Sequence, residues 1–407
     1  MITTLDDLRG ALSAAFGEGL AALDPARLVY DALPLLPPRR ARVIVIAAGK
    51  GASAMAAGAL ARWPERIERA LVVTVAPAPS LVAARLSEVR VAAHPVPDSR
   101  SVSAAQEARH LAGSLGPGDV LLALISGGAS SLLSEPPEGL TLREKQALVT
   151  ALLDRGVPIA AVNLVRRHCS RVKGGRLARA AGGARVLTLV ISDVIGGTVQ
   201  DVGSGPTVPD PTTLEAARAV LREAGLAEPP GMSESVKPGE VRARARILAD
   251  PRALASAVAE ALGRRGLRAI VEEPDEGDAS VVVDRRLARA AGLAPGEALV
   301  IATEPTLRLP AVRGRGGRAG WVALAAMRHL PADVALLCVA SDGVDGSSGA
   351  AGALVTRADA ERAPADSTEA ALEAFDDARV HQALGTALPG GAAGNNLADL
   401  HIVARLP

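Results

Sequence analysis

Residues 42–51 read RVIVIAAGKG, a short run of branched apolar residues that ends in two glycines on either side of a lysine. An apolar run of this length, closed by glycine, is typical of a strand that is buried on both faces. The next residues, 52–57, read ASAMAA and are typical of the start of a helix. A buried strand, a glycine turn and a helix make the first half of a βαβ unit. The stretch therefore predicts an α/β protein with a largely parallel sheet.

The same alternation continues along the chain. Further strands are expected at residues 70–75, 89–93, 119–125, 185–191, 267–272, 298–303, 334–340 and 399–405. A polar stretch rich in proline and glycine, residues 228–235, predicts a domain boundary. We expect a first domain at 1–235 plus 371–407, and a second at 236–370. The last strand is expected to return to the first domain, because the loop before it carries residues typical of a site.

Composition limits the classes of function. The chain has 407 residues, a formal net charge of +1 and only 1% aromatic residues. With so small a net charge, the protein has no electrostatic field that would attract nucleic acid or an anionic membrane. With so few aromatic side chains, it has no surface on which the bases of a single strand could stack. The acidic amino terminus does not read as a signal peptide, and the apolar runs are too short to span a bilayer, so a cytoplasmic protein is expected. The two cysteines and six histidines have no metal-ligand spacing, so zinc is not indicated.

Lysine is rare, and its positions are informative. Of 45 basic residues only Lys50, Lys145, Lys173 and Lys237 are lysine, and the first and third of these lie in glycine turns. A compact ammonium in a tight turn suits a phosphate or a carboxylate. The alternative is that lysines lie near glycine by chance, since the chain has 41 glycines.

Several polar turns each follow a predicted strand. Ser126-Gly127-Gly128 suits a phosphate cradle or a simple helix cap, and Asp193 suits a Mg²⁺ ligand, a proton acceptor or a helix cap. In the second half of the chain, Asp342 and Asp345 suit either metal ligands or residues that form a turn. Arg318 suits either a residue that binds an anion or an arginine exposed to solvent. The carboxyl ends of parallel strands meet at one edge, which is where open α/β sheets bind ligands.

Taken in order, these motifs resemble the glycerate 2-kinase family, the type II glycerate kinases with a MOFRL-type carboxyl-terminal domain. The most specific parts are residues 163–178, NLVRRHCSRVKGGRLA, and residues 342–346, DGVDG. The resemblance implies a Rossmann-like first domain, a smaller second α/β domain with a mixed MOFRL-type sheet, and a site in the interdomain cleft. It implies an enzyme that transfers phosphate from ATP, with Mg²⁺, to the C2 hydroxyl of D-glycerate, giving 2-phosphoglycerate. The expected partner is a small molecule, and a homodimer is compatible with the family.

The resemblance also implies roles for single residues. Lys50, Asp193 and Arg318 are the expected catalytic residues. Nucleotide contacts are expected from Gly49, Lys50, Ser126, Gly127, Gly128 and Lys173, and Mg²⁺ contacts from Asp193, Asp342 and Asp345.

The chain departs from the family pattern at Gly197, Ala319, Trp321, Ala392 and Ala393, where polar family residues are replaced. Such losses favour two alternatives, a kinase for another small hydroxy acid or an impaired nucleotide-binding homologue. A hydroxypyruvate reductase is less favoured, because no GxGxxG follows the first strand. Trp321 either fills space meant for a polar substrate end or packs in the domain core.

Overall fold

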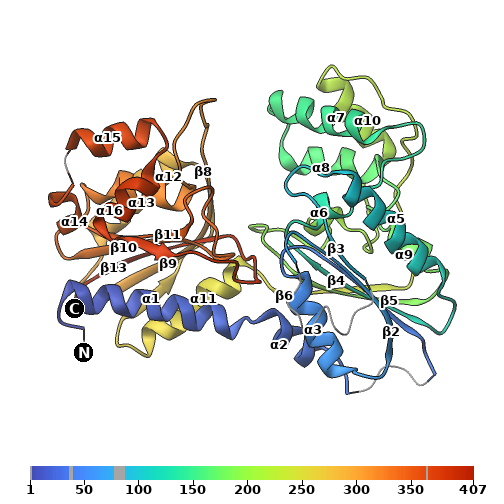
Figure 1. The fold of residues 1–407 in the computed structure, drawn as a ribbon, viewed down its shortest axis with the longest axis horizontal. Coiled ribbons are helices and arrows are strands. Elements are labelled where there is room, and N and C mark those ends of the chain that lie inside the picture. Colours follow the sequence, from blue (N-terminus) through green and yellow to red (C-terminus); the bar gives the residue numbers. More distant parts are fainter. Residues whose placement is uncertain (1, 36–39, 78–87, 364) are drawn as a thin grey trace. The chain divides into compact units, whose positions relative to one another are not determined.

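The computed structural model describes residues 2–35, 40–77, 88–363 and 365–407. The chain divides into two compact units (Figure 1). We call residues 25–248 the Rossmann unit, and residues 1–24 with 249–407 the mixed-sheet unit. In the described part of the chain, no helix has the length and apolarity needed to cross a bilayer.

The Rossmann unit is built on a six-stranded sheet with the order β3-β2-β1-β4-β5-β6. The strands are β1 (Val43–Ala48), β2 (Ile67–Thr74), β3 (Glu88–Val91), β4 (Val120–Ser126), β5 (Arg185–Ile191) and β6 (Ala243–Ala249). β1 pairs in parallel with β2 and β4, β2 with β3, and β4 with β5. This is the strand order of dinucleotide-binding Rossmann folds, in which the direction of winding reverses between β1 and β4.

The helices of this unit pack on the sheet or on one another, and the central strands of the sheet are buried. The helices are α2 (Pro25–Ala32), α3 (Ala52–Arg62), α5 (Ser99–Gly113), α6 (Ala129–Leu132), α7 (Leu142–Asp154), α8 (Ile159–His168), α9 (Arg176–Ala180), the 3₁₀ helix η1 (Val202–Ser204) and α10 (Leu214–Glu223). Every residue of β1 and β4 is buried, which explains their continuous apolar sequences. Ile44 and Ile46 pack with Ala108 and Leu111 of α5, while a second apolar cluster holds α7, α8 and α10 together.

The mixed-sheet unit has a seven-stranded sheet. Its order is β12-β11-β10-β13-β9-β7, with β8 also paired to β9. The strands are β7 (Arg268–Val271), β8 (Asp275–Asp278), β9 (Glu297–Thr306), β10 (Val334–Ala340), β11 (Ala350–Thr356), β12 (Ala387–Pro389) and β13 (Asp399–Arg405). β7 and β8 run parallel to β9, whereas the other pairs are antiparallel. The predicted mixed sheet is confirmed.

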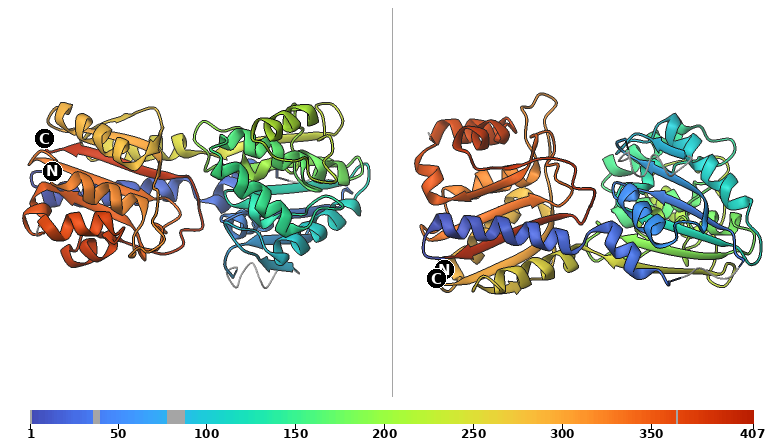
Figure 2. Two further views of the ribbon diagram at one scale, coloured as in Figure 1. Left: turned by 90° about the horizontal axis from the view of Figure 1, so that it is seen from above. Right: turned by 60° about the horizontal axis from the view of Figure 1, so that its bottom comes forward.

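Two layers of helix enclose this sheet. They are α1 (Leu5–Ala22), α11 (Pro251–Gly263), α12 (Ala279–Gly292), α13 (Arg318–Met327), α14 (Arg357–Glu361), α15 (Ala365–Glu373) and α16 (Asp377–Leu384). Figures 1 and 2 show α1 lying beside α11 along one face of the sheet, and α12, α13 and α16 on the other face.

The predicted domain boundaries are wrong in three places. β13 lies between β10 and β9 in the mixed sheet, so residues 371–407 do not return to the first domain. Residue types in a loop do not determine which sheet the next strand joins. Residues 1–24 belong with the mixed-sheet unit, because Leu8 and Leu12 of α1 are fully buried there.

The third error is the boundary at residue 235. The stretch at 228–235 is a loop of the Rossmann unit, because the Ser233 amide donates to His168 O at 3.1 Å and the Val236 amide donates to Gly174 O at 2.9 Å. The chain then adds β6 to the Rossmann sheet before it leaves this unit.

Candidate functional site

Two glycine turns are hydrogen-bonded to each other at the switch point, where the direction of winding of the Rossmann sheet reverses between β1 and β4. β1 and β4 run side by side with Ala48 opposite Ile125, so their following loops start at the same edge. The Lys50 amide donates to Gly127 O at 2.9 Å, and the Gly51 amide donates to Ser126 Oγ at 3.0 Å. In open α/β sheets this switch point is the usual ligand crevice.

Glycine is required in both turns. Gly49 has φ +131°, and a Cβ on it would lie 2.1 Å from Ser126 Oγ. Gly128 has φ +86°, and a Cβ there would lie 3.5 Å from Lys50 Cγ and 3.1 Å from His94 Cδ2. The half-buried stem of Lys50 therefore passes close to the Gly128 backbone. The predicted gathering of these turns is confirmed, while their nucleotide contacts stay predictions.

Asp193 lies at the same edge of the sheet. It follows β5, which pairs with β4 so that Ile191 stands opposite Ser126. Residues 192–201 form turns, so Asp193 does not cap a helix there. The carboxylate is half-buried, and the neighbouring Ser192 Oγ accepts the Val194 amide at 3.2 Å. The helix-cap alternative for Asp193 is therefore wrong, and its metal or proton role stays a prediction.

The Lys173 ammonium is enclosed by oxygens of the protein itself. Its Nζ donates to Ser130 O at 2.7 Å, Ser130 Oγ at 3.0 Å, Leu133 O at 3.2 Å and Gly203 O at 3.4 Å. The side chain is 1% exposed, and burial lowers its pKa well below the ordinary value. The ammonium thus holds backbone segments of the protein together, and the predicted nucleotide contact of Lys173 stays a prediction.

A second cationic side chain, that of Arg166, donates a hydrogen bond to Ser130 Oγ. Arg166 Nη2 donates to it, Arg166 Nη1 donates to Asn163 Oδ1 at 3.2 Å, and Ser204 Oγ lies 3.1 Å from Ser130 Oγ. Arg166 was not predicted as a site residue. One signal was present, because Asn163 and Arg166 stand three apart on a helix and therefore share a face.

In the mixed-sheet unit, Arg318 is the first residue of α13. The carboxylate of Asp345 holds the turn at Gly317 that leads into this helix. Asp345 Oδ1 accepts the Ala319 amide at 3.1 Å and Oδ2 accepts the Gly320 amide at 2.8 Å. A Cβ on Gly317 would lie 2.1 Å from the Asp345 carboxylate, so only glycine fits. Burial raises the pKa of Asp345, and the two amides act against that rise. Both oxygens of Asp345 accept amides of the helix start, and its predicted metal role is untested.

Asp342, two residues after the end of β10, is a simpler case. Its Oδ1 accepts the Val344 amide at 3.0 Å, which is the turn-forming contact expected of an aspartate. The side chain is half-buried, and its predicted metal role is untested.

Two carboxylates hold the Arg318 guanidinium. Nε lies 2.6 Å from Asp399 Oδ2, Nη2 donates to Asp399 Oδ1 at 3.2 Å, and Nη1 donates to Glu304 Oε1 at 3.0 Å. Burial acts to lower the pKa of Arg318, but the two carboxylates outweigh it and the net shift is upward. Asp399 was missed in the sequence because it is the first residue of a strand rather than part of a glycine turn.

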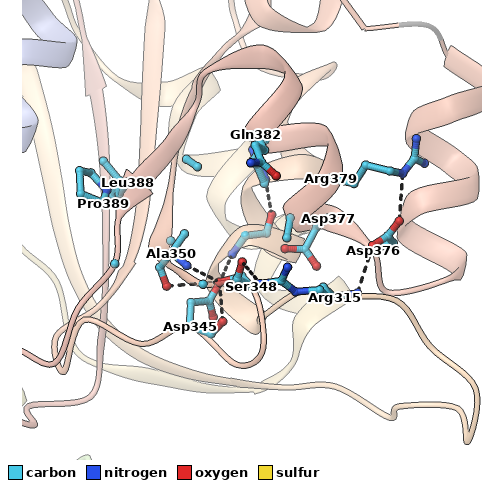
Figure 3. A pocket seen from close by; sticks show the side chains of 17 residues that line it. Arg315, Asp345, Ser348, Ala350, Asp376, Asp377, Arg379, Gln382, Leu388 and Pro389 are labelled. Atoms are coloured by element: carbon cyan, nitrogen blue, oxygen red, sulfur yellow. Dashed lines mark hydrogen bonds and ion pairs between the residues drawn. The ribbon is translucent and has the colours of Figure 1, made fainter.

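The mixed-sheet unit also has a cavity of about 440 Å³ (Figure 3). Its lining includes Asp345, Asp377, Arg315 and His381, but not Arg318. Asp377 is 1% exposed, and burial together with the charge of Asp345 raises its pKa to about 7. A Cβ on Gly320 would lie within 3.3 Å of both carboxylates, so the two acids face the same glycine.

Trp321 packs inside the mixed-sheet unit. Its ring stacks on Phe375 with centroids 6.4 Å apart, and its Nε1 donates to Leu372 O at 3.1 Å. The adjacent Ala319 is fully buried in the same apolar cluster. Trp321 is half-buried and packs against this core, which favours the core-packing alternative. Replacing Ala319 by Asn and Trp321 by Glu would therefore disrupt packing rather than restore a substrate contact.

Comparison with known proteins places both units. Residues 11–237 match a family described as a domain of unknown function (DUF4147), and residues 297–399 match the MOFRL family. A D-glycerate 2-kinase of Thermotoga maritima is 32% identical over 95% of this chain and 95% of its own length. A protein of Agrobacterium vitis that carries a provisional hydroxypyruvate reductase name is 37% identical over 97% of this chain and 94% of its own. The crystal structure of a glycerate kinase from Thermotoga maritima superposes with a TM-score of 0.87 at 29% identity, covering 98% of this chain and 100% of that one.

Proposed function

This chain belongs to the glycerate kinase family, and we propose that it transfers the terminal phosphate of ATP to the C2 hydroxyl of D-glycerate, forming 2-phosphoglycerate. The single observation that carries the proposal is the pair of bonded glycine turns at the β1–β4 switch point, with Lys50 beside Gly128. Such a turn pair lets a backbone approach phosphate closely while a lysine supplies charge.

The residues of the Rossmann unit would then have separate roles in phosphate binding and in activation of the hydroxyl. Lys50 would neutralise nucleotide phosphates, and the backbone of Gly49 and of 126–128 would admit them without steric conflict. Asp193 would orient the attacking hydroxyl and accept its proton. When bound, ATP supplies the phosphoryl group and Mg²⁺ offsets its charge, so the protein has mainly to position and stabilise.

The acidic residues fit a magnesium ion that arrives with a nucleotide. Among the described residues, no group of three or more His, Cys, Asp or Glu side chains could hold a metal by itself. Mg²⁺ commonly needs only one or two protein carboxylates, its remaining ligands being water and phosphate oxygens. Asp193 and Asp342 are half-buried carboxylates of this kind, and we propose them as the candidates.

Arg318 would hold an anionic group, the substrate carboxylate or the moving phosphate. Asp399 is 2% exposed and grips the guanidinium through two nitrogens, so the direction of the side chain is set before any ligand binds. Preorganised donors of this kind lose little conformational freedom on binding, which is where much catalytic stabilisation originates.

The test is release of ADP from Mg²⁺-ATP in the presence of D-glycerate, of its L-isomer and of a panel of three- and four-carbon hydroxy acids. Turnover with D-glycerate above the others, with the phosphate found on C2, is the expected result. A better four-carbon acid would favour the alternative kinase. ATP binding without ADP release would favour the impaired homologue, and NADH oxidation with hydroxypyruvate would favour the reductase.

A further inference from the structure

Three cationic side chains of the Rossmann unit are withdrawn from water without an acidic partner. Lys145 is 4% exposed, Lys173 is 1% exposed and Arg166 is half-buried. Within the described ranges, no carboxylate lies at ion-pair distance from any of the three. Buried charges are normally paired, because an unpaired one costs several kcal/mol of desolvation.

The three do not satisfy one another. Lys173 and Arg166 donate to the same hydroxyl, Ser130 Oγ. Lys145 Nζ, on α7, is buried and has no hydrogen-bond partner among the described residues. Its ammonium is therefore the donor for which the fold supplies no acceptor.

The strongest charged neighbour of Lys145 has the same sign as Lys145 itself. Burial lowers the pKa of Lys145 to about 7, with Arg166 as its strongest charged neighbour and Arg176 adding to the effect. Cys169 and Glu135 act in the opposite direction. Glu135, however, is already held by Arg109 through two bonds of 3.0 and 3.1 Å. Glu135 is therefore already paired with another cation than Lys145.

We propose that Lys145 and Arg166, beside Ser130, form a binding site for the oxyanion end of a ligand. The oxyanion is the carboxylate of the hydroxy acid or a phosphate of the nucleotide, an identity that rests on the proposed kinase function. Ser130 stands two residues beyond Gly128, so the site continues the turn that follows β4. The arriving oxyanion supplies the acceptor that Lys145 lacks and shares the guanidinium of Arg166 with Ser130.

The decisive variant is Lys145→Met, which keeps the length of the side chain and removes its charge. Calorimetric titration of the intact protein would use D-glycerate, ATP and inorganic phosphate as separate ligands, with glycerol as the uncharged analogue. Loss of a charge-assisted bond predicts roughly 10- to 100-fold weaker binding of glycerate or of ATP, and the arm that weakens identifies the oxyanion. The matched control is Arg143→Met, an exposed cation on the same helix, which should change neither affinity.

Stability provides a second readout. Because the variant removes an unpaired buried charge, Lys145→Met should unfold at an equal or higher denaturant concentration than the natural chain. A merely structural lysine would give the opposite shift. If the variant did not fold, Arg166→Gln would replace it and should produce the same loss of affinity.

Proton uptake gives a third readout. An anion beside Lys145 raises its pKa from about 7, so binding at pH 8 should take up a proton and the measured heat should depend on the buffer. That dependence should vanish in Lys145→Met. Unchanged affinity for all three ligands, with no buffer dependence, would overturn the site even if the chain turned over glycerate. Conversely, phosphate binding that depends on Lys145 would uphold the site even if no hydroxy acid were phosphorylated.

Discussion

Lys50 and Lys173 show how far residue types alone can predict a site. Both lysines lie in glycine turns, and the sequence gives them the same interpretation. In the fold, Lys50 is half-buried at the switch point, whereas Lys173 is enclosed by four oxygens. The difference comes from the segments around Ser130 and Gly203, which are distant in sequence and meet Lys173 only after folding. Burial of a single side chain could not be predicted from its neighbours along the chain.

Lys50→Arg should be nearly as damaging as Lys50→Ala, with turnover reduced roughly 10²-fold or more. We expect the broad guanidinium fork not to fit a glycine turn that accommodates a compact ammonium. Steady-state ADP release measures the loss. Lys237→Arg is a suitable control, because Lys237 pairs with Glu234 at 2.7 Å in the same unit and should tolerate arginine. If Lys50→Arg kept most of the turnover, Lys50 would be only a generic surface charge.

Asp193→Asn should lower kcat by roughly 10²- to 10⁴-fold, because the amide can neither accept the hydroxyl proton nor offer a full charge to a metal. The fold should be retained, since Asp193 caps no helix. Turnover and a urea denaturation curve, measured on the same preparation, separate the two effects. Turnover at the natural level would transfer the predicted role to Asp342.

Asp377 should make the stability of the protein depend on pH. Its folded pKa of about 7 lies above the ordinary aspartate value of 3.8, so the folded state holds a proton that the unfolded state has released between these pH values. Raising the pH through this window should therefore lower the free energy of unfolding, by up to about 1.4 kcal/mol per pH unit. In Asp377→Asn the decline should be smaller. Urea denaturation at pH 5, 6, 7 and 8 tests this, and parallel curves for the two proteins would contradict it.

At the scale of elements, strands with a strongly apolar sequence were predicted well, whereas β6 and β11 were not predicted. β1 and β10 are continuous apolar runs, while β4, β5 and β13 are apolar runs with one to three polar residues. The observed bounds of all five fall within a residue of those expected. β6 reads ARARILA and lies at the end of the sheet order, where its arginines stay in water, so its sequence has no buried-strand signal. β11 contains Gly352, which lies so close to β10 that a Cβ would be 2.1 Å from Cys338 O. Glycine in a strand signals such a close approach only after the neighbour is known.

Two glycines of α1 should respond to alanine in opposite directions. A Cβ on Gly19 would lie 2.4 Å from Val258 Cγ2 of α11, so Gly19→Ala should lower the free energy of unfolding by about 1–3 kcal/mol. Gly17 has nothing within 4 Å, so Gly17→Ala should raise it by about 0.5–1 kcal/mol through helix propensity alone. Chemical denaturation of the whole chain measures both. Equal stabilisation by the two changes would show that α1 does not pack closely on α11.

For the whole molecule, the sequence predicted two α/β units but not how the chain is shared between them. Periodicity reports which face of a helix is buried, but not which sheet buries it. α1 is joined to residues 249–407 by packing and by the Arg9–Asp359 ion pair of 2.7 Å, across more than half of the chain. Long-range pairing of this kind has no local sequence signal.

The division predicts the behaviour of fragments. Residues 25–248 carry an apolar core of their own and should unfold cooperatively in isolation. Residues 249–407 should be markedly less stable than the same segment mixed with a peptide of residues 1–24, because that peptide restores the cover provided by Leu8 and Leu12. Circular dichroism during denaturation measures each case. Stability of 249–407 that the peptide does not change would contradict the assignment of α1.

The discontinuous mixed-sheet unit also imposes an order on events at the ribosome. α1 is synthesised first, yet its partners α11 and β10 emerge only after the whole Rossmann unit. At usual elongation rates the delay between α1 and β10 is about 15 to 60 s. During this time Leu8 and Leu12 have no native surface to cover them, although the intervening unit can already fold. The nascent chain thus carries an exposed apolar helix at its leading end, which is the kind of segment that chaperones bind during translation.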